Sequence, residues 1–327
     1  MVWAPERGRA LFAGANHGVP HRLNDVWEFD LPTLTWTMLY APDNARSYGG
    51  LGDDPSDVEY KDGILVTRRG GPAIIGHTWW GITYDVPRRR LLYMNTWVSD
   101  QDQIIKRLGA DPATRYKGPP LWAFEPEQKR WSMVKSERPW PRAPFASMLE
   151  YVPSIDGAIW HSNDWEQYAT WLYDPKLNNW RDLKANAASG DFTKQSARPE
   201  QVAYVGPVRN LIVAHSERST YHFDVARSQW RKVLEAPKDS TDVPFGHDAR
   251  SVFYYDPVSG HGLLVELASV TVWAYDPATI KWQRLQPEGE ALPKGPGHRR
   301  LAFIDPLRNV LVVTQTDAIW AYRYRTK

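Results

Sequence analysis

Cysteine is absent from the 327-residue sequence, which excludes disulfide bonds, thiolate metal ligands and cysteine nucleophiles. No apolar run approaches the roughly 18 residues that a membrane-spanning helix needs, so no membrane span is predicted. A charge excess of one sign is also missing, because 40 basic and 38 acidic residues leave a net charge of +2. This balance argues against a nucleic-acid-binding surface. Neither a glycine-rich phosphate loop between a strand and a helix nor a G-x-S-x-G nucleophile turn occurs.

Aromatic and turn-forming residues are abundant instead. The chain holds 17 Trp, its aromatic fraction is 13%, and 26 Pro and 22 Gly interrupt it at frequent intervals. This composition is typical of many short strands joined by tight turns, and long helices are not expected. The sequence therefore predicts an all-β protein.

A ten-residue pattern recurs along the whole chain. Its clearest copy runs from Trp273 to Trp282, and further copies begin at Trp27, Trp122, Trp171, Tyr221 and, in shortened form, Trp320. Apolar residues alternate with period two, an acidic residue and usually a proline follow, and a Trp then begins another strand, so each copy predicts a β-hairpin. Because an isolated hairpin is only marginally stable in water, the copies must bury their aromatic faces against one another.

A second pattern, two apolar strands joined by a proline-containing turn, precedes each hairpin. Its copies are 2–14, 82–95, 149–162, 203–215, 253–267 and 302–315. Each unit thus contains four strands, named a, b, c and d, in one small antiparallel sheet. The second Trp of successive hairpins recurs at positions 131, 180, 230 and 282, a period of about 50 residues that fits the blades of a β-propeller.

Trp36 and Trp131 are separated by nearly two periods. Two insertions, 43–75 and 98–120, explain this spacing better than a degenerate extra blade, and a short helix is expected over Gln103–Leu108. We therefore expect one domain, 1–327, with six blades, seven being the alternative. The b/c and d/a connections, with both insertions, should share one end of the ring, called the top face, where the insertions could form a lid.

These units resemble the kelch family of β-propellers over essentially the whole chain. The spaced aromatics and the Asp-Pro turns carry the resemblance, whereas the family's double glycine at the end of strand b is mostly replaced, as by His161, His215 and Glu266. The resemblance implies a six-bladed ring. The copper oxidases of this superfamily need a cysteine for their thioether cofactor, so the resemblance to them extends to the fold only.

The first and last units are incomplete. The first has only Met1–Ala4 for strand a, and the last ends before strand d, so the terminal blade is expected to be incompletely closed. Because an unpaired strand is a liability, we expect upstream residues that supply the missing strand in the full-length product. A signal segment upstream of Met1 and an extracytoplasmic location, periplasmic or secreted, are also expected.

Candidate functional residues gather where strand a begins and strand b ends. Strand a is innermost in a propeller, so these positions should converge near the axis of the top face. The candidate catalytic residues are His77, His161, His215 and His247. The candidate substrate-binding residues are Asn95, Trp97, Arg142, Asn163, Arg198, Glu266 and His298. The structural alternative is that these polar groups hydrogen-bond to neighbouring loops and fill the central tunnel.

This concentration of His, Arg, Asn and Trp leads to three functional hypotheses. The first is an exported carbohydrate-binding propeller that acts as a lyase on uronic-acid-containing glycans. In that reaction Arg142 or Arg198 offsets the carboxylate charge and one histidine removes the α-proton. The second is a non-catalytic scaffold that binds a protein or a glycan, and the third is a sugar isomerase or mutarotase.

The cofactor is undetermined at this stage. Several histidines and Glu266 could ligate a divalent metal, Zn²⁺ or Mn²⁺. No closely spaced histidine motif occurs, so such a site would have to draw its ligands from different blades.

Overall fold

Strands dominate the protein, as the composition predicts. The computed structural model describes residues 1–14, 23–43, 46–47, 58–75, 81–94, 101–141, 148–163, 168–185, 202–246, 251–293, 295, 297, 300–315 and 317–324. No helix among these residues has the length and apolar character needed to cross a bilayer.

Five four-stranded antiparallel sheets correspond to the first five predicted units. Blade 1 contains β1 (Val2–Ala4), β2 (Arg9–Ala13), β3 (Val26–Asp30) and β4 (Thr35–Tyr40). Blade 2 contains β9 (Ile82–Asp85), β10 (Arg90–Met94), β11 (Leu121–Glu125) and β12 (Arg130–Met133). Blade 3 contains β13 (Met148–Val152), β14 (Gly157–Asn163), β15 (Tyr168–Asp174) and β16 (Asn179–Asp182). Blade 4 contains β17 (Val202–Gly206), β18 (Leu211–Ser216), β19 (Ser219–Asp224) and β20 (Gln229–Glu235). Blade 5 contains β21 (Ser251–Tyr255), β22 (Gly262–Glu266), β23 (Thr271–Asp276) and β24 (Lys281–Arg284).

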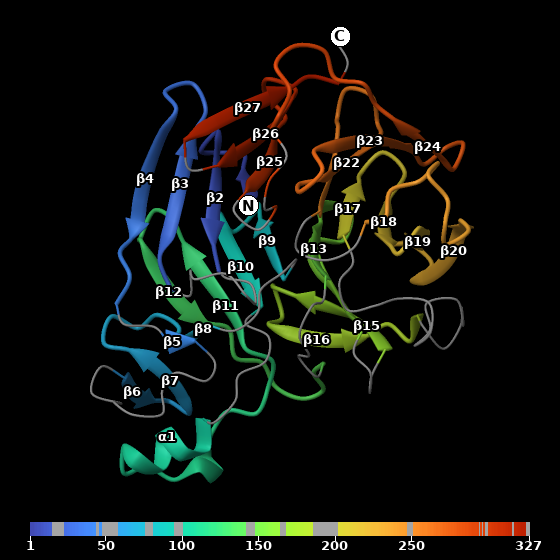
Figure 1. Cartoon of the computed structure of the whole chain (residues 1–327). Helices are drawn as coiled ribbons and strands as arrows, with labels where there is room; N and C mark the ends of the chain where they lie inside the picture. Colours follow the sequence, from blue (N-terminus) through green and yellow to red (C-terminus); the bar gives the residue numbers. More distant parts are fainter. Residues whose placement is uncertain are drawn as a thin grey trace.

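Blade 6 has three strands, β25 (Leu301–Asp305), β26 (Val310–Gln315) and β27 (Ala318–Tyr322). The six sheets form a ring in which the first strand of each blade lies innermost, next to the first strands of both neighbours (Figure 1). The predicted six-bladed propeller with an incomplete last blade is therefore confirmed. Blades 6 and 1 close the ring through aromatic contacts, with Phe303 6.2 Å from Trp3 and 5.8 Å from Phe29 between ring centroids.

The repeated Trp of strand d covers the last aromatic of strand c in its own blade. The ring centroids of these pairs are 4.8–5.1 Å apart: Phe29 and Trp36, Phe124 and Trp131, Tyr173 and Trp180, Phe223 and Trp230, Tyr275 and Trp282. The two residues of each pair lie opposite each other in the register, as Tyr275 and Trp282 do. The recurring spacing in the sequence thus reflects one packing contact that is made in each of five blades.

The described parts of both insertions lie side by side. The hairpin β6 (Val58–Lys61) and β7 (Ile64–Thr67) packs on α1 (Gln101–Arg107), and this unit has a core of its own that includes Leu65, Ile104 and Ile105. A short parallel pair, β5 (Arg46–Ser47) and β8 (Ile74–Ile75), and the 3₁₀ turn η1 (Pro112–Thr114) complete it. In Figure 1 the unit lies beside blades 1 and 2 rather than forming a further blade of the ring. The short helix predicted over Gln103–Leu108 is present, beginning two residues earlier.

Candidate functional site

Most of the predicted site residues fall outside the described part of the chain. These are His77, His247 and His298 together with Asn95, Trp97, Arg142 and Arg198. Asn163 ends β14, and only its backbone is described. Convergence of these side chains near the axis stays a prediction, and three predicted residues, His161, His215 and Glu266, can be placed with their contacts.

His161 lies near the end of the second strand of blade 3 and is fully buried at the junction with blade 4. Its Nδ1 lies 2.9 Å from the hydroxyl of Thr170 on the neighbouring strand. The same hydroxyl accepts a 2.8 Å hydrogen bond from Nε1 of Trp230, the repeated Trp of blade 4, whose ring also packs on the imidazole at 5.0 Å. His161 therefore takes part in a hydrogen-bonded link between two blades.

His215 repeats this arrangement one blade further along. Its Nδ1 lies 2.9 Å from the Thr220 hydroxyl, which accepts a 3.0 Å hydrogen bond from Nε1 of Trp282 in blade 5. Its Nε2 lies 2.9 Å from the carbonyl oxygen of Pro244, and the side chain is fully buried. The His–Thr–Trp link thus joins blades 3 and 4 and again blades 4 and 5.

Burial fixes the charge of these two imidazoles. Desolvation lowers the pKa of His161 to about 3 and that of His215 to about 4, so both are neutral at pH 7. For His215 the tautomer is also fixed, because the Pro244 carbonyl can only accept: the ring proton lies on Nε2 and donates to this carbonyl, and Nδ1 accepts from the Thr220 hydroxyl. These contacts give both histidines a role in blade packing, while their catalytic role stays an untested prediction.

Glu266 ends the second strand of blade 5, at the position the sequence predicts, and it is partly exposed. Its carboxylate accepts a 3.1 Å hydrogen bond from the backbone N–H of Phe245, which precedes blade 5. The Ser269 hydroxyl lies 3.4 Å from the other carboxylate oxygen. Glu266 therefore holds loop backbone at the end of its blade. Within the described ranges no group of three metal-ligating side chains is brought together, so the described residues form no Zn²⁺ or Mn²⁺ site.

Another carboxyl, which the sequence reading did not single out, lies at the inner side of the ring. Burial raises the pKa of Tyr254 in β21 of blade 5, and the charge of Glu150, in β13 of blade 3, raises it further. Because blade 4 separates these two strands, the two side chains approach each other on the axial side of the ring. The Tyr254 hydroxyl donates a 2.5 Å hydrogen bond to the Ala302 carbonyl of blade 6. The surrounding protein raises the pKa of Glu150 to about 8 by desolvation, so its carboxyl is mostly protonated at pH 7.

The six a/b turns form a recurrent surface that the sequence reading also left without a function. This surface, called the turn face, comprises residues 5–8, 86–89, 153–156, 207–210, 256–261 and 306–309. Each turn contains a proline, and each has a residue with positive φ near its end: Gly8, Arg89, Asp156, Asn210, Gly260 and Asn309. Because strand a is innermost, these turns surround the ring axis at the end opposite the predicted top face.

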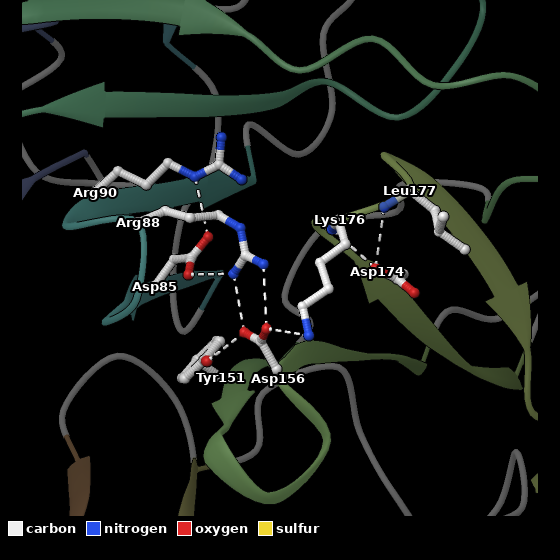
Figure 2. A network of polar contacts seen from close by, with 8 residues as sticks. All are labelled: Asp85, Arg88, Arg90, Tyr151, Asp156, Asp174, Lys176 and Leu177. Atoms are coloured by element: carbon white, nitrogen blue, oxygen red, sulfur yellow. Dashed lines mark hydrogen bonds and ion pairs between the residues drawn. The ribbon is translucent and has the colours of Figure 1, made fainter.

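Neighbouring turns contact one another at three junctions of the ring. Between blades 2 and 3, Arg88 donates hydrogen bonds of 2.9 and 3.2 Å to both carboxylate oxygens of Asp156 and a further 3.0 Å bond to Asp85 (Figure 2). Figure 2 also shows the Tyr151 hydroxyl and Lys176 on the same Asp156 carboxylate. These hydrogen bonds lower the pKa of Asp156.

The other turn contacts continue the same arrangement. Ser154 of blade 3 donates to the side-chain oxygen of Asn210 of blade 4. A Cβ atom placed on Gly8 would lie 3.6 Å from Leu307 Cδ1, so the turns of blades 1 and 6 also meet. The turn face is therefore held in shape by contacts between blades.

The outward side of the turn face carries apolar and basic side chains together with the exposed Glu6, whose carboxylate accepts from the Tyr84 hydroxyl. Four of the exposed large apolar residues lie on it, with exposed fractions of 40% for Val86, 38% for Ile155, 84% for Val208 and 68% for Leu307. Three of its arginines are exposed, Arg89, Arg209 and Arg308, whereas Asp256 in the face and Asp85 and Asp305, which directly precede two of its turns, are buried.

The buried aspartates are used inside the turns. Asp305 accepts the backbone N–H groups of Leu307 and Arg308, and Asp256 accepts those of Val258 and Ser259. Arg89 and Arg209 have no ion pair with another described residue. The face thus presents apolar side chains beside positive charge, a combination that marks interaction surfaces.

A shallow pocket of about 430 Å³ lies where the insertion unit meets the ring. It is lined by Lys61, Asp62, Ile64, Val66, Met133, Lys135 and Asn178. The Lys135 ammonium group, after blade 2, donates to the Asp62 carbonyl of the hairpin, and the Asn178 amide of blade 3 donates to the Lys135 carbonyl. These contacts fix the insertion unit against the ring.

Comparison with known proteins adds no family. No family model matches the chain, and no curated protein matches it. Among solved structures, a protein of unknown function from Bacteroides thetaiotaomicron is 8% identical with a TM-score of 0.40, over 83% of this chain and 57% of that one. A chain of a nidogen/laminin complex is 10% identical with a TM-score of 0.48, over 94% of this chain and 89% of that one. The chain thus spans little more than half of the Bacteroides protein, and the fold assignment rests on its own strand pairing.

Proposed function

We propose that this propeller is a non-catalytic interaction scaffold whose turn face binds a partner protein through an acidic and apolar segment. The observation that carries this proposal is the joint exposure of apolar and arginine side chains on neighbouring turns, of which those of blades 2, 3 and 4 are hydrogen-bonded to one another. Braced turns lose little conformational entropy on binding, which favours affinity. Arginines beside apolar groups favour the binding of segments that carry carboxylates and weaken the binding of basic partners.

The apolar pair Val208 and Leu307 offers a sharp test, because the chain contains a matched control. Val208 and Leu307 are 84% and 68% exposed on a/b turns, while Leu34 and Leu177 are 58% and 69% exposed on c/d turns. Random 15-residue peptides displayed on phage would be selected against the full chain, and an enriched peptide would be labelled for fluorescence polarisation. We expect enriched sequences to combine Asp or Glu with apolar residues.

The expected binding pattern follows from the geometry. V208D/L307D should weaken binding at least tenfold, as should R89E/R209E, whereas L34D/L177D should bind like the unmodified chain. Binding should also weaken as NaCl rises from 50 to 500 mM, because the arginines are exposed to screening ions. Absence of enrichment, or equal losses in the a/b and c/d variants, would overturn the proposal.

The carbohydrate hypothesis is tested with the same protein. Incubation with uronic-acid-containing polysaccharides should give no unsaturated product absorbing in the near ultraviolet if the chain is a scaffold. Formation of such a product would overturn the scaffold proposal in favour of the predicted lyase. Alanine substitution of His77 or His247 would then show, by loss of activity, which imidazole acts as the base. Export stays a prediction, tested by locating the full-length product in cell fractions.

A further inference from the structure

The last strand of each four-stranded blade lies at the outer edge of its sheet, as β4 does in blade 1 (Figure 1). Among the described residues no further strand pairs with any of these five edges. Four of the strands carry arginine or lysine, which disfavours pairing with a strand of another chain: Arg130 in β12, Arg181 in β16, Arg231 and Lys232 in β20, and Lys281 and Arg284 in β24. The fifth, β4, reads Thr-Trp-Thr-Met-Leu-Tyr and has neither charge nor proline. The edge of blade 1 therefore lacks the protection that the other four have.

The register of blade 2 shows which backbone groups of a strand d face outward. The Val134 N–H, directly after β12, donates a 2.8 Å hydrogen bond to the Leu121 carbonyl of strand c. Backbone groups alternate in direction along a strand, so Trp131, three positions earlier, turns its N–H and C=O groups away from strand c. The equivalent hydrogen bond is present in blades 3 and 5. The repeated Trp thus presents its backbone groups at the outer edge of the blade.

β4 keeps this register over its first four residues. Trp36 lies opposite the last aromatic of strand c, as the repeated Trp does in the other blades. The backbone N–H and C=O groups of Trp36 and Met38 therefore point to the open edge, while those of Thr37 point to β3. A β-bulge follows Met38, so the straight part of the edge is Thr35–Met38. Thr35 and Thr37 lie on one face of the strand, and both are exposed.

A second β4 complements this edge. In an antiparallel pair with a two-fold axis at Thr37, Trp36 of one copy exchanges both backbone hydrogen bonds with Met38 of the other, and the two Thr37 side chains face each other. Threonines directly opposite each other form a favourable pair, and no charges meet. The same pairing of β16 or β20 would place Arg181 or Arg231 opposite its own copy, which is unfavourable. The absence of charge therefore suits β4, among the described strands d, to pairing with its own copy.

We propose that this protein forms a symmetric dimer through β4, in which β4 of each copy pairs antiparallel with β4 of the other and one sheet runs through both first blades. The interface is isologous, so the assembly closes after two copies. The paired segment is short and buries much less than the roughly 1,600 Å² of a standard stable interface, so the dissociation constant should be on the order of 10 to 100 µM. The edge lies on the rim of blade 1, whereas the a/b turns surround the axis. The dimer therefore leaves the turn face free and does not depend on the function proposed for it.

The first test is sedimentation velocity of the full chain between 1 and 500 µM, in which we expect the dimer fraction to rise with concentration. T37K places two like charges opposite each other and should weaken dimerisation at least tenfold. The matched control is Q283K, at the same exposed position after the Trp of β24, which should dimerise like the unmodified chain. An equimolar mixture of T37K and T37E should recover the dimer, because opposite charges then meet at the two-fold axis.

Cross-linking tests the register and does not depend on charge. The chain has no cysteine, so T37C introduces a single thiol. Residues that face each other in a non-hydrogen-bonded antiparallel pair have Cα atoms about 4.5 Å apart, within reach of a disulfide. Oxidation of T37C should therefore give a covalent dimer on non-reducing gels. T35C, exposed on the same face, should stay monomeric, because its two copies would be about 14 Å apart along the strands.

Each measurement can contradict the dimer. A chain that stays monomeric up to 500 µM, a dimer that T37K does not weaken, a T37K and T37E mixture that stays monomeric, or equal cross-linking of T35C and T37C would overturn the proposal. V208D/L307D should dimerise like the unmodified chain, which separates this edge from the turn face.

Discussion

Burial sets the protonation of the described interior histidines, and with it the acid stability of the protein. His161, His215 and His222 are at most 5% exposed, and desolvation lowers their pKa values to about 3, 4 and 4. Between pH 6.5 and 4 the unfolded chain binds protons at these sites while the folded chain does not, so stability falls as the pH falls through this window. The neutral imidazole is therefore a condition of folding.

The pH effect can be measured one residue at a time. We expect the free energy of unfolding in urea to fall by about 1–2 kcal/mol per histidine between pH 6.5 and pH 5, since one pKa unit corresponds to about 1.36 kcal/mol. H222Q keeps a partner for the Tyr275 hydroxyl, which lies 2.8 Å from Nε2 of His222, but it removes one proton site. Its stability should vary less steeply with pH, and an unchanged slope would contradict the assignment.

Glu150 changes the pH dependence of stability in the opposite direction. Its pKa is raised to about 8 in the folded chain, so the folded state holds a proton that the unfolded state releases between about pH 4.5 and 8. Stability from this group is full at low pH and is lost as the pH rises. E150Q should therefore stabilise the chain by about 2 kcal/mol at pH 9 and by little at pH 4. An equal effect at both pH values would show that the carboxyl ionises normally.

Residue positions were easier to predict than residue environments. The repeat predicted His161 and His215 at the ends of second strands, and the structure places both within the last three residues of these strands. Their burial depends on Trp230 and Trp282, which lie 69 and 67 positions further along the chain and approach them only because the blades are radial. A pattern within one unit carries no information about the neighbouring unit's packing.

At the scale of elements, two blade junctions depend on a shared hydroxyl. Thr170 and Thr220 each satisfy an indole N–H and an imidazole nitrogen at once. T170V is nearly isosteric but leaves both buried groups without this partner, and we expect it to destabilise the chain by about 2–3 kcal/mol in urea unfolding. T220V should lower the free energy of unfolding by a similar amount.

The matched control for this junction is T170S, which keeps the hydroxyl and loses a methyl group. T170S should lower the free energy of unfolding by about 1 kcal/mol, because removing the methyl group leaves a small cavity. If valine and serine were equally destabilising, packing rather than hydrogen bonding would hold these blades together.

Strands were predictable for a physical reason. The Trp pairing that builds each blade lies within ten residues of sequence, so the period-two alternation and the turn chemistry both appear locally, and the short helix α1 was also foreseen. The turn face was missed as a functional surface because its exposure results from all six turns together. No single turn, such as that containing Val208, differs in sequence from an ordinary hairpin turn.

At the scale of the whole molecule, the ring and the insertion unit have separate cores. Ile105 is fully buried in the insertion unit, whereas Leu264 is fully buried between blades. I105A should lose about 2–4 kcal/mol locally, so hydrogen exchange measured by mass spectrometry should accelerate in 58–75 and 101–120 and stay unchanged in the blades. L264A should accelerate exchange in the blades as well, and identical maps for the two variants would contradict this division.

The two kinds of joint in the ring also differ in their response to cold. The links centred on Thr170 and Thr220 are polar, while the described joint between blades 6 and 1 is made by Trp3, Phe29 and Phe303. The hydrophobic contribution to apolar contacts weakens on cooling, whereas hydrogen bonds do not depend on the hydrophobic effect. The joints between blades 3 and 4 and between blades 4 and 5 add these polar links to apolar cores, so cooling should loosen the described aromatic joint between blades 6 and 1 before them.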